Sequence, residues 1–454
     1  MAAGAPLLER LFRLSEHGTT ARRELRGGAV TFLTMSYIIF VQPAVLGLTG
    51  MDPGAVMTAT CVASALATLV MAFGANYPVA LAPCMGENFF FVTVAGLTVA
   101  GQQVGWRGAL AAVFVSGVLF LGLSLFKVRE RIFHAIPGSL RHAIAAGIGV
   151  FIALIGLSEA GVVVNNPHAL VTLGDLSAGT PLLALFGLAL TAALMARRVP
   201  GAILLGMLAT ALVGLPFEIV TWPGGLPVSA PPSLAPVAFE LDLGALAEPA
   251  MVGVVLVFLL MVLFDTVGTL TGVAHHAGLM REGTLPRAGR ALLSDAVGTT
   301  AGALLGCSTV SSYIESAAGV SEGARTGLAS VVTAALFLLA LFFAPVVQMV
   351  GGGTPQAAGP PLHPVIAPAM ILVGAMMMRG VREIAWDDLT EAIPAFLVIV
   401  GMPFTYNIAT GLALGFIAYP LLKLLAGRGR EVGALVYVLG LVFVGHLALV
   451  VHFH

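Results

Sequence analysis

The chain has 454 residues, of which 58% are hydrophobic and 9% are charged, and its formal net charge is -1. A chain of this composition cannot cover a water-soluble surface, so we expect a polytopic membrane protein held in a lipid bilayer. The near-zero net charge and the lack of a long basic run argue against a nucleic-acid partner. The first 27 residues carry five arginines but no apolar core with a cleavage site, so we expect no signal peptide.

Apolar segments predict an all-α protein with about fourteen spans in two sets of seven. The first set covers 28–48, 54–74, 79–96, 107–126, 137–158, 181–197 and 199–220. The second set covers 250–274, 289–305, 308–320, 325–347, 364–379, 390–404 and 405–424. Several segments are shorter than the roughly 20 residues that a straight helix needs to cross a bilayer, which predicts broken or half helices. An apolar C-terminal segment, 432–454, predicts one extra helix, and the sequence leaves open whether it spans the membrane.

The basic residues predict the orientation of these spans. If the N-terminal segment 1–27 is cytoplasmic, the loops on the same side hold most of the remaining basic residues, as the positive-inside rule requires. They are Lys127, Arg129, Arg131, Arg197, Arg198, Arg281, Arg287, Arg290, Arg325, Arg379 and Arg382. The loops 159–180, 216–249 and 348–363 contain no Lys or Arg, so we expect them on the outer side.

An odd number of spans per half predicts an inverted repeat, because the second half then enters the membrane from the opposite side. The third and tenth spans correspond, since both are short and are interrupted by Pro or Gly, in 78–88 and 306–315. In transporters, such paired interruptions mark a site near the bilayer midplane, where half-helix N-termini present free N–H groups. We therefore expect the functional residues in these two segments and beside them.

Two carboxylates lie inside apolar or small-residue segments of membrane length. Asp265 interrupts the apolar run 250–274, and Glu315 follows a hydroxyl-rich turn that includes Thr309. An ionisable group is costly at bilayer depth, so both predict a substrate or proton site. The structural alternative for Asp265 is a carboxylate bonded to neighbouring hydroxyls such as Thr266 or Thr269, and the turn before Glu315 could serve close helix packing.

The turn that opens the predicted third half helix carries two further candidates. Glu87 and Asn88 could cap its first turn or contact a ligand, and the Asn88 amide offers both a donor and an acceptor to a heterocycle edge. Gly86 and Gly268 are expected to be close-packing positions that support the site.

Asp295 is interpreted as structural. It follows Arg281, Arg287 and Arg290 closely in the sequence, so a structural ion pair or a link between helices is favoured over a role in binding.

Histidine and cysteine spacing predicts neither a metal site nor a cofactor. His275 and His276 are adjacent and point to opposite sides of a helix, with no third ligand nearby. Cys61, Cys84 and Cys307 show no disulfide framework and no metal-ligand spacing. The chain also lacks a His-Glu-x-x-His motif and a nucleophile with an identifiable base, so we expect no catalytic residue and no enzyme.

Six segments of the chain resemble the nucleobase–cation symporter-2 (nucleobase–ascorbate transporter) family, and within it the AzgA-like purine permease branch. They are 15–20, 28–40, 82–91, 264–270, 308–316 and 391–396. The resemblance implies a core domain formed by 28–126 and 250–347 and a gate domain formed by 137–220 and 364–424. It also implies proton-coupled uptake of purine bases by alternating access across the plasma (inner) membrane.

The same resemblance implies that Asp265, Glu315 and Asn88 hold the purine and that the two carboxylates also carry the proton. Relatives usually have Asp where this chain has Val262, and Gly where it has Cys84. Glu87 could replace part of the missing carboxylate.

The runner-up function is anion transport of the sulfate-permease type, because two half-helix N-termini suit an anion. Asp265 and Glu315 would repel an anion unless they are protonated. The preferred purine, the proton stoichiometry and the oligomeric state, with a homodimer among the options, are left open.

Overall fold

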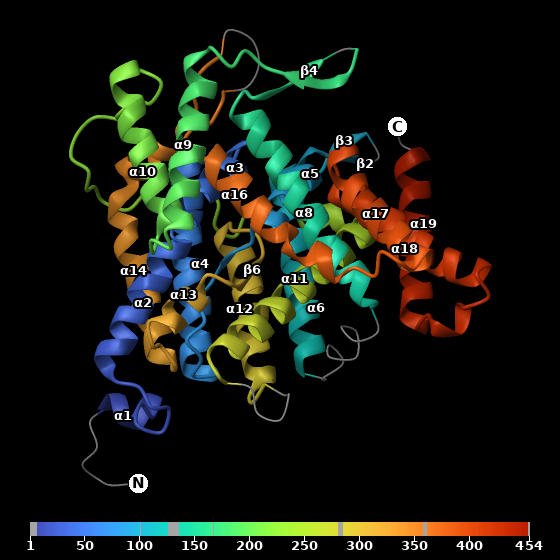
Figure 1. Ribbon diagram of the computed structural model, residues 1–454, viewed down its shortest axis with the longest axis horizontal. Helices are drawn as coiled ribbons and strands as arrows, with labels where there is room; N and C mark the ends of the chain where they lie inside the picture. Colours follow the sequence, from blue (N-terminus) through green and yellow to red (C-terminus); the bar gives the residue numbers. More distant parts are fainter. Residues whose placement is uncertain are drawn as a thin grey trace.

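The computed structural model describes residues 7–99, 101–125, 136–166, 168–279, 285–356 and 361–452. Over these ranges the protein is helical, with three short two-stranded sheets that the all-α prediction did not include (Figure 1). Lys127, Arg129, Arg131 and Arg281, four of the basic residues used to predict orientation, lie outside the described ranges.

The bounds of the helices and strands are as follows. The α-helices are α1 (Leu7–Phe12), α2 (Ala21–Met35), α3 (Ile38–Gly47), α4 (Pro53–Gly74), α5 (Met85–Gly96), α6 (Gly105–Leu125), α8 (Gly138–Glu159), α9 (Gly179–Ala196), α10 (Ala202–Gly214), α11 (Pro249–His276), α12 (Ala288–Leu305), α13 (Ser316–Ser321), α14 (Gly327–Ala340), α15 (Ala344–Gly351), α16 (Ala367–Met377), α17 (Leu389–Phe404), α18 (Ile408–Leu425) and α19 (Ala434–His452). Single 3-10 turns are η1 (Leu215–Phe217), η2 (Leu243–Ala247), η3 (Leu341–Phe343), η4 (Met378–Glu383) and η5 (Gly429–Glu431). The strands are β1 (Leu81–Pro83), β2 (Thr98–Val99), β3 (Gln102–Gln103), β4 (Val163–Asn166), β5 (Leu170–Leu173) and β6 (Val310–Ser312).

Eight helical units in the described part of the chain are long and apolar enough to cross a membrane. They are Ala21–Gly47, Pro53–Gly74, Gly105–Ser124, Gly138–Glu159, Gly179–Ala196, Pro249–His276, Gly327–Gly351 and Ile408–Leu425. The third and tenth predicted spans are instead a short strand followed by a short helix, β1 with α5 and β6 with α13. The prediction that these two segments are interrupted is therefore confirmed.

The N-terminal segment 1–27 is not separate from the first span, because α2 already begins at Ala21. Thr20 caps this helix, because its side chain accepts a hydrogen bond from the N–H group of Arg23. Glu24, in the first turn, is fully buried and accepts hydrogen bonds from the backbone N–H groups of Arg325 (2.8 Å), Thr326 (3.3 Å) and Ala329 (3.2 Å). These N–H groups lie at the start of α14, where the first N–H groups of a helix lack partners in a preceding turn. A charged residue that serves this purpose cannot be found from hydropathy.

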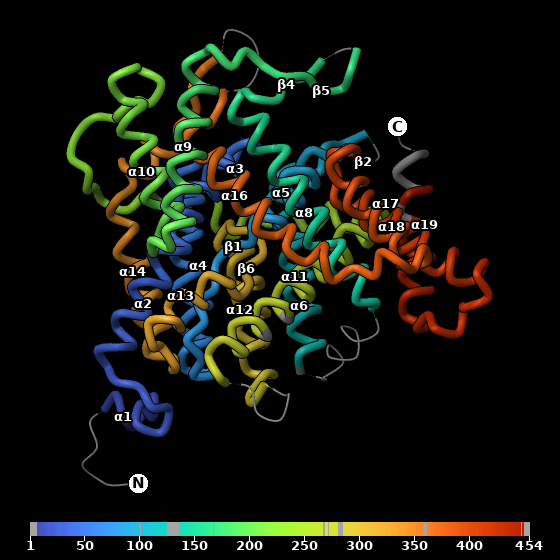
Figure 2. Tube along the Cα trace, in the orientation of Figure 1, coloured from blue at the N-terminus to red at the C-terminus, as the bar shows by residue number. Residues whose placement is uncertain are grey.

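The helices pack mainly in two groups (Figure 2). One group contains α2, α4, α6, α12, α13 and α14, and the other contains α8, α9, α10, α16, α17 and α18. Small residues permit close contact within each group: a Cβ atom on Gly149 of α8 would lie 2.6 Å from the carbonyl oxygen of Gly374 of α16.

The predicted extra helix at the C-terminus is confirmed as α19. It packs against α18 and α11, and the rings of Phe416 and Phe443 stack with centroids 5.5 Å apart.

Candidate functional site

The candidate site lies where two strands that are far apart in the sequence, β1 and β6, pair at the centre of the molecule (Figure 2). We call this pair of strands the strand crossing. β1 and β6 are antiparallel, with Ala82 opposite Ser311, and the hydrogen bond from Cys84 N to Thr309 O (3.2 Å) extends the pair. α5 begins directly after β1, and α11 contacts both β6 and α5. The first turn of α5, the strand β6 and the middle of α11 therefore meet at one place.

Asp265 projects from α11 onto this crossing. Its Oδ2 atom accepts a hydrogen bond from Ser311 Oγ (2.5 Å) and one from Cys84 Sγ (3.0 Å). The hydroxyl partner is therefore on β6, and it is neither of the adjacent threonines that the sequence offered. The Thr266 hydroxyl is buried and has no hydrogen-bond partner among the described residues.

Glu315 is the N-cap residue of α13 and is partly exposed. Its Oε1 atom accepts a hydrogen bond from the Tyr37 hydroxyl (2.9 Å). Tyr37 is 2% exposed and lies at the break between α2 and α3. Sequence reasoning missed it, although a phenol hydroxyl inside the first apolar span was a usable signal.

Asn88 is fully buried and uses its amide within the protein. Its Nδ2 donates to Gln42 Oε1, and its Oδ1 accepts from Ser308 Oγ. Gln42 Nε2 in turn donates to Ser308 Oγ at 3.0 Å, which closes a triangle of side chains. A ligand that contacts Asn88 has to exchange one of these partners or use the remaining N–H group. The sequence analysis did not single out Gln42 either, although a carboxamide side chain inside an apolar run indicates a polar partner in the membrane.

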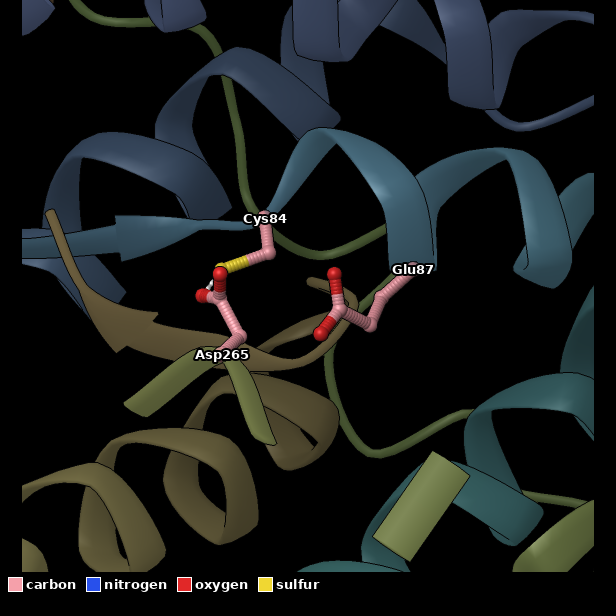
Figure 3. Close-up of side chains that lie close together, drawn as sticks. All are labelled: Cys84, Glu87 and Asp265. Atoms are coloured by element: carbon pink, nitrogen blue, oxygen red, sulfur yellow. Dashed lines mark hydrogen bonds between the residues drawn. The ribbon is translucent and has the colours of Figure 1, made fainter. Parts of the chain in front are cut away.

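Glu87 lies in the first turn of α5 and is 3% exposed. Within the described ranges its carboxylate has no hydrogen bond or ion pair with another side chain. Figure 3 shows this carboxylate pointing toward Cys84 and Asp265, and ligand atoms of the three residues lie within 4.8 Å of one another. The three side chains therefore form one polar cluster.

The predicted supporting residues differ in what they contact. A Cβ atom on Gly86 would lie 2.7 Å from Ile148 Cγ2, so this glycine permits the close contact between α5 and α8. A Cβ atom on Gly268 would meet no atom within 4 Å, so packing does not explain that glycine. The Thr309 hydroxyl is buried without a hydrogen-bond partner in the described structure, beside the crossing strands.

Asp295 links α12 to β6, because its Oδ1 atom accepts a hydrogen bond from Ser312 Oγ (3.0 Å). This contact agrees with the structural interpretation of that carboxylate. Of the three arginines considered as partners, Arg287 places its guanidinium 5.2 Å from the centroid of the Tyr77 ring, and Arg281 lies outside the described residues.

Aromatic side chains close the space between the site and the second helix group. Phe89 of α5 packs edge-on against Phe151 of α8, with ring centroids 6.3 Å apart, and Phe151 packs against Tyr406 at 5.3 Å.

Val262, the position at which relatives of the resembled branch usually carry Asp, is buried with Phe120, Leu263 and Ala296 and adds only apolar surface.

Sequence comparison identifies relatives that align with nearly the whole chain. A model described as "Permease family" (Xan_ur_permease) matches residues 22–414. A putative permease of Methanocaldococcus jannaschii is 50% identical, over 96% of this chain and 97% of that protein. The guanine/hypoxanthine permease PbuG of Bacillus subtilis is 44% identical over 96% and 98%, and the adenine permease AdeP of Escherichia coli is 42% identical over 97% and 96%.

Structural comparison shows a similar fold in two anion transporters of low sequence identity. The transmembrane domain of the cyanobacterial bicarbonate transporter BicA superimposes with a TM-score of 0.62 at 16% identity, over 87% of this chain and 97% of that one. The murine anion transporter Slc26a9 in its inward-facing state gives 0.59 at 11% identity, over 93% and 73%. The chain belongs to the Xan_ur_permease family of permeases, of the nucleobase–cation symporter-2, AzgA-like type, and is a multi-pass membrane transporter and not an enzyme.

Proposed function

We propose that the protein takes up purine nucleobases of the hypoxanthine, guanine and adenine class together with protons, by alternating access. The observation that carries this proposal is the 44% and 42% identity, over nearly the whole chain, to permeases named for guanine/hypoxanthine and for adenine. The carboxylates at the strand crossing support it, because a neutral purine presents N–H donors that a carboxylate accepts and ring nitrogens that an amide can serve.

In this proposal Asp265 and Glu315 accept hydrogen bonds from the purine, while Asn88 and Glu87 complete the polar lining and Thr309 supplies a hydroxyl. The donors that hold Asp265 and Glu315 in the structure are a serine, a thiol and a phenol, all of them neutral. A carboxylate held by neutral donors can accept a proton without breaking an ion pair. This arrangement supports a role for the same two residues in proton coupling.

The proposed architecture has fourteen spans in an inverted repeat of seven and seven, with a core domain and a gate domain. The two helix groups and the likeness to the BicA fold support it. We place the N-terminus in the cytoplasm of the plasma (inner) membrane, because the loops 159–180, 216–249 and 348–363 carry no Lys or Arg.

A second candidate is anion transport, which the fold likeness to bicarbonate and anion transporters favours. The residues at the crossing oppose it, because Glu87, Asp265 and Glu315 bring three carboxylates to the site and an ionised carboxylate repels an anion.

The deciding experiment is uptake by cells that lack their own purine permeases and express this protein. Radiolabelled hypoxanthine, adenine and guanine should accumulate, and sulfate and bicarbonate should not. Unlabelled hypoxanthine, guanine, adenine, xanthine and uracil, added as competitors, rank the preference. A protonophore should abolish accumulation, whereas accumulation that follows sodium at fixed pH would contradict proton coupling. Uptake of sulfate without uptake of any base would favour the second candidate.

A further inference from the structure

The cluster of Cys84, Glu87 and Asp265 has the composition and spacing of a metal site. Cys84 and Glu87 are three residues apart at the start of α5, so their side chains share a face of the helix, and Asp265 faces them from α11 (Figure 3). Ligand atoms of all three lie within 4.8 Å of one another. Side-chain adjustments of about 1 Å would bring them to the Zn–S distance of about 2.3 Å and the Zn–O distance of about 2.1 Å around one ion.

The cluster also has no compensating positive charge among the residues that the structure describes. No ion pair found in the described ranges involves Glu87 or Asp265, and Glu87 is buried with no partner on another side chain. Two carboxylates in a site of low polarity repel each other unless a proton or a cation lies between them. Glu87 is thus only 3% exposed, its carboxylate faces Cys84 and Asp265, and the hydrogen bond that it makes in the described structure is with backbone and not with a cation.

The ligand set selects the kind of cation. A thiolate with two carboxylates suits a borderline or soft divalent ion such as Zn²⁺ or Cd²⁺, whereas Mg²⁺ and Ca²⁺ prefer sites made only of oxygen atoms. Three protein ligands leave a tetrahedral ion one open position for water.

We propose that Cys84, Glu87 and Asp265 bind a thiophilic divalent cation, and that this cation blocks the site to the transported base. When the cation binds, the S–H bond of Cys84 breaks and the sulfur–metal bond forms. The thiol proton and the proton shared by the two carboxylates are released to solvent, while Ser311 continues to donate to Asp265. Sequence spacing predicted no metal site, because Asp265 lies 181 residues from Cys84 and only the crossing of β1 and β6 brings them together. The blocking step rests on the proposed function, whereas the binding of the cation does not.

The test is binding of Cd²⁺ to the purified full-length protein in lipid nanodiscs, followed by the ultraviolet absorbance of the thiolate–cadmium bond. We expect saturable binding at one site per protein in the wild type. Cys84→Ser should remove the absorbance band, and Glu87→Gln should weaken the affinity by roughly tenfold or more, because loss of a metal contact costs at least as much as loss of a supporting group.

The matched control is Cys61→Ala, which removes a fully buried thiol in α4 and should leave the band and the affinity unchanged. If Cys84→Ser retains the band, the site is not at Cys84 and the proposal is wrong. If Cys84→Ser does not fold, an unchanged affinity in Glu87→Gln would overturn the proposal in the same way.

Competition by hypoxanthine separates this inference from the proposed function. Excess hypoxanthine should raise the apparent Kd for Cd²⁺ in nanodiscs, and Cd²⁺ should inhibit uptake in cells less strongly in Glu87→Gln than in the wild type, relative to each variant's own rate. Cd²⁺ binding that hypoxanthine does not affect would refute the blocking step. The uptake experiment without metal tests the proposed function by itself, and its outcome does not depend on whether Cd²⁺ binds.

Discussion

The carboxylates at the strand crossing and those at the end of α18 are held by different kinds of partner. At the crossing, Asp265 and Glu315 accept hydrogen bonds only from neutral groups in the described structure. Near α18, Lys423 has 2% of its side chain exposed, and its Nζ atom lies 2.9 Å from Glu391 and 3.0 Å from Glu431. A second cation, Arg428, contacts Glu431 (2.8 Å) and Asp388 (2.7 Å).

These partners change the proton affinity of the second cluster. The hydrogen bond from Arg428, with a further one from Lys423, lowers the pKa of Glu431 to about 2. Hydrogen bonds from Thr390 and Arg428 hold the pKa of Asp388 below its ordinary value. Carboxylates held in this way remain ionised at physiological pH and join α17, α18 and η5. A carboxylate paired with cations thus stays ionised and serves to hold helices together. A carboxylate held by neutral donors can instead exchange a proton or bind a ligand.

The largest expected effect is the loss of uptake when a carboxylate at the crossing becomes an amide. Asp265→Asn and Glu315→Gln keep the size of the side chain and remove its charge, which costs about 2–3 kcal/mol per charged hydrogen bond to substrate, or about 30- to 140-fold in uptake rate. The measurement is the initial rate of hypoxanthine uptake per amount of folded protein. Glu322→Gln, in a surface pair with Arg26 (2.8 Å), is the control and should stay within about twofold of the wild type. Normal uptake by Asp265→Asn would show that the carboxylates at the strand crossing are no more important for transport than those around Lys423.

The second prediction concerns the ionic cluster, where removal of its central cation should reduce stability and not transport. Lys423→Met leaves Glu391 without a close cation and leaves Glu431 with Arg428 alone. It should lower the free energy of unfolding by about 1–3 kcal/mol, less than for a fully buried pair because Glu431 is half exposed. Thermal unfolding in detergent measures the change. Arg382→Met, whose side chain is 81% exposed, should have little effect. A variant that is stable but does not transport would show that this cluster also belongs to the transport machinery.

Thiol labelling tests whether the two interrupted segments line the same cavity. Substrate at ten times its Kd should slow modification of Cys84 about tenfold if bound substrate covers it, because the free site is diluted by that factor. Cys307, whose Sγ lies 3.9 Å from Gln42 Nε2, should be protected as well, and Cys61 should be neither labelled nor protected. Rates measured in variants that retain one cysteine at a time distinguish the three. Labelling of Cys84 and Cys307 that substrate leaves unchanged would place the cavity elsewhere.

The smallest expected effect is a several-fold change with pH that separates proton coupling from protein stability. Uptake should rise as the external pH falls from about 8 to about 6, because protons then drive entry. The contribution of the ionic cluster around Lys423 to stability should stay constant over that range. A carboxylate with a lowered pKa stabilises the fold above its ordinary pKa of 4.5, and for Glu431 this contribution is lost only as the pH falls toward about 2. A difference in melting temperature between the wild type and Lys423→Met that changes in parallel with uptake would contradict this separation.

Features of the fold that depend on local composition were predictable. Membrane insertion follows from the apolar content, the interrupted segments follow from Pro and Gly within short apolar runs, and α19 follows from the apolar segment at 432–454. The positions of Asp265 and Glu315 were found for the same reason, since a carboxylate in an apolar run is recognisable from its neighbours alone.

The partners of these residues were decided only by the tertiary structure. The structural alternative for Asp265 named Thr266 or Thr269 as its hydroxyl partners, but the pairing of β1 with β6 brings in Ser311 and Cys84 from other segments. Glu24 likewise caps α14 from about 300 residues away, within a helix that hydropathy began too late. Burial cost is a property of one residue in its local segment, so the sequence reveals it. The choice of hydrogen-bond partner depends on which distant segments meet in space, and only the packed helices and crossing strands determine that.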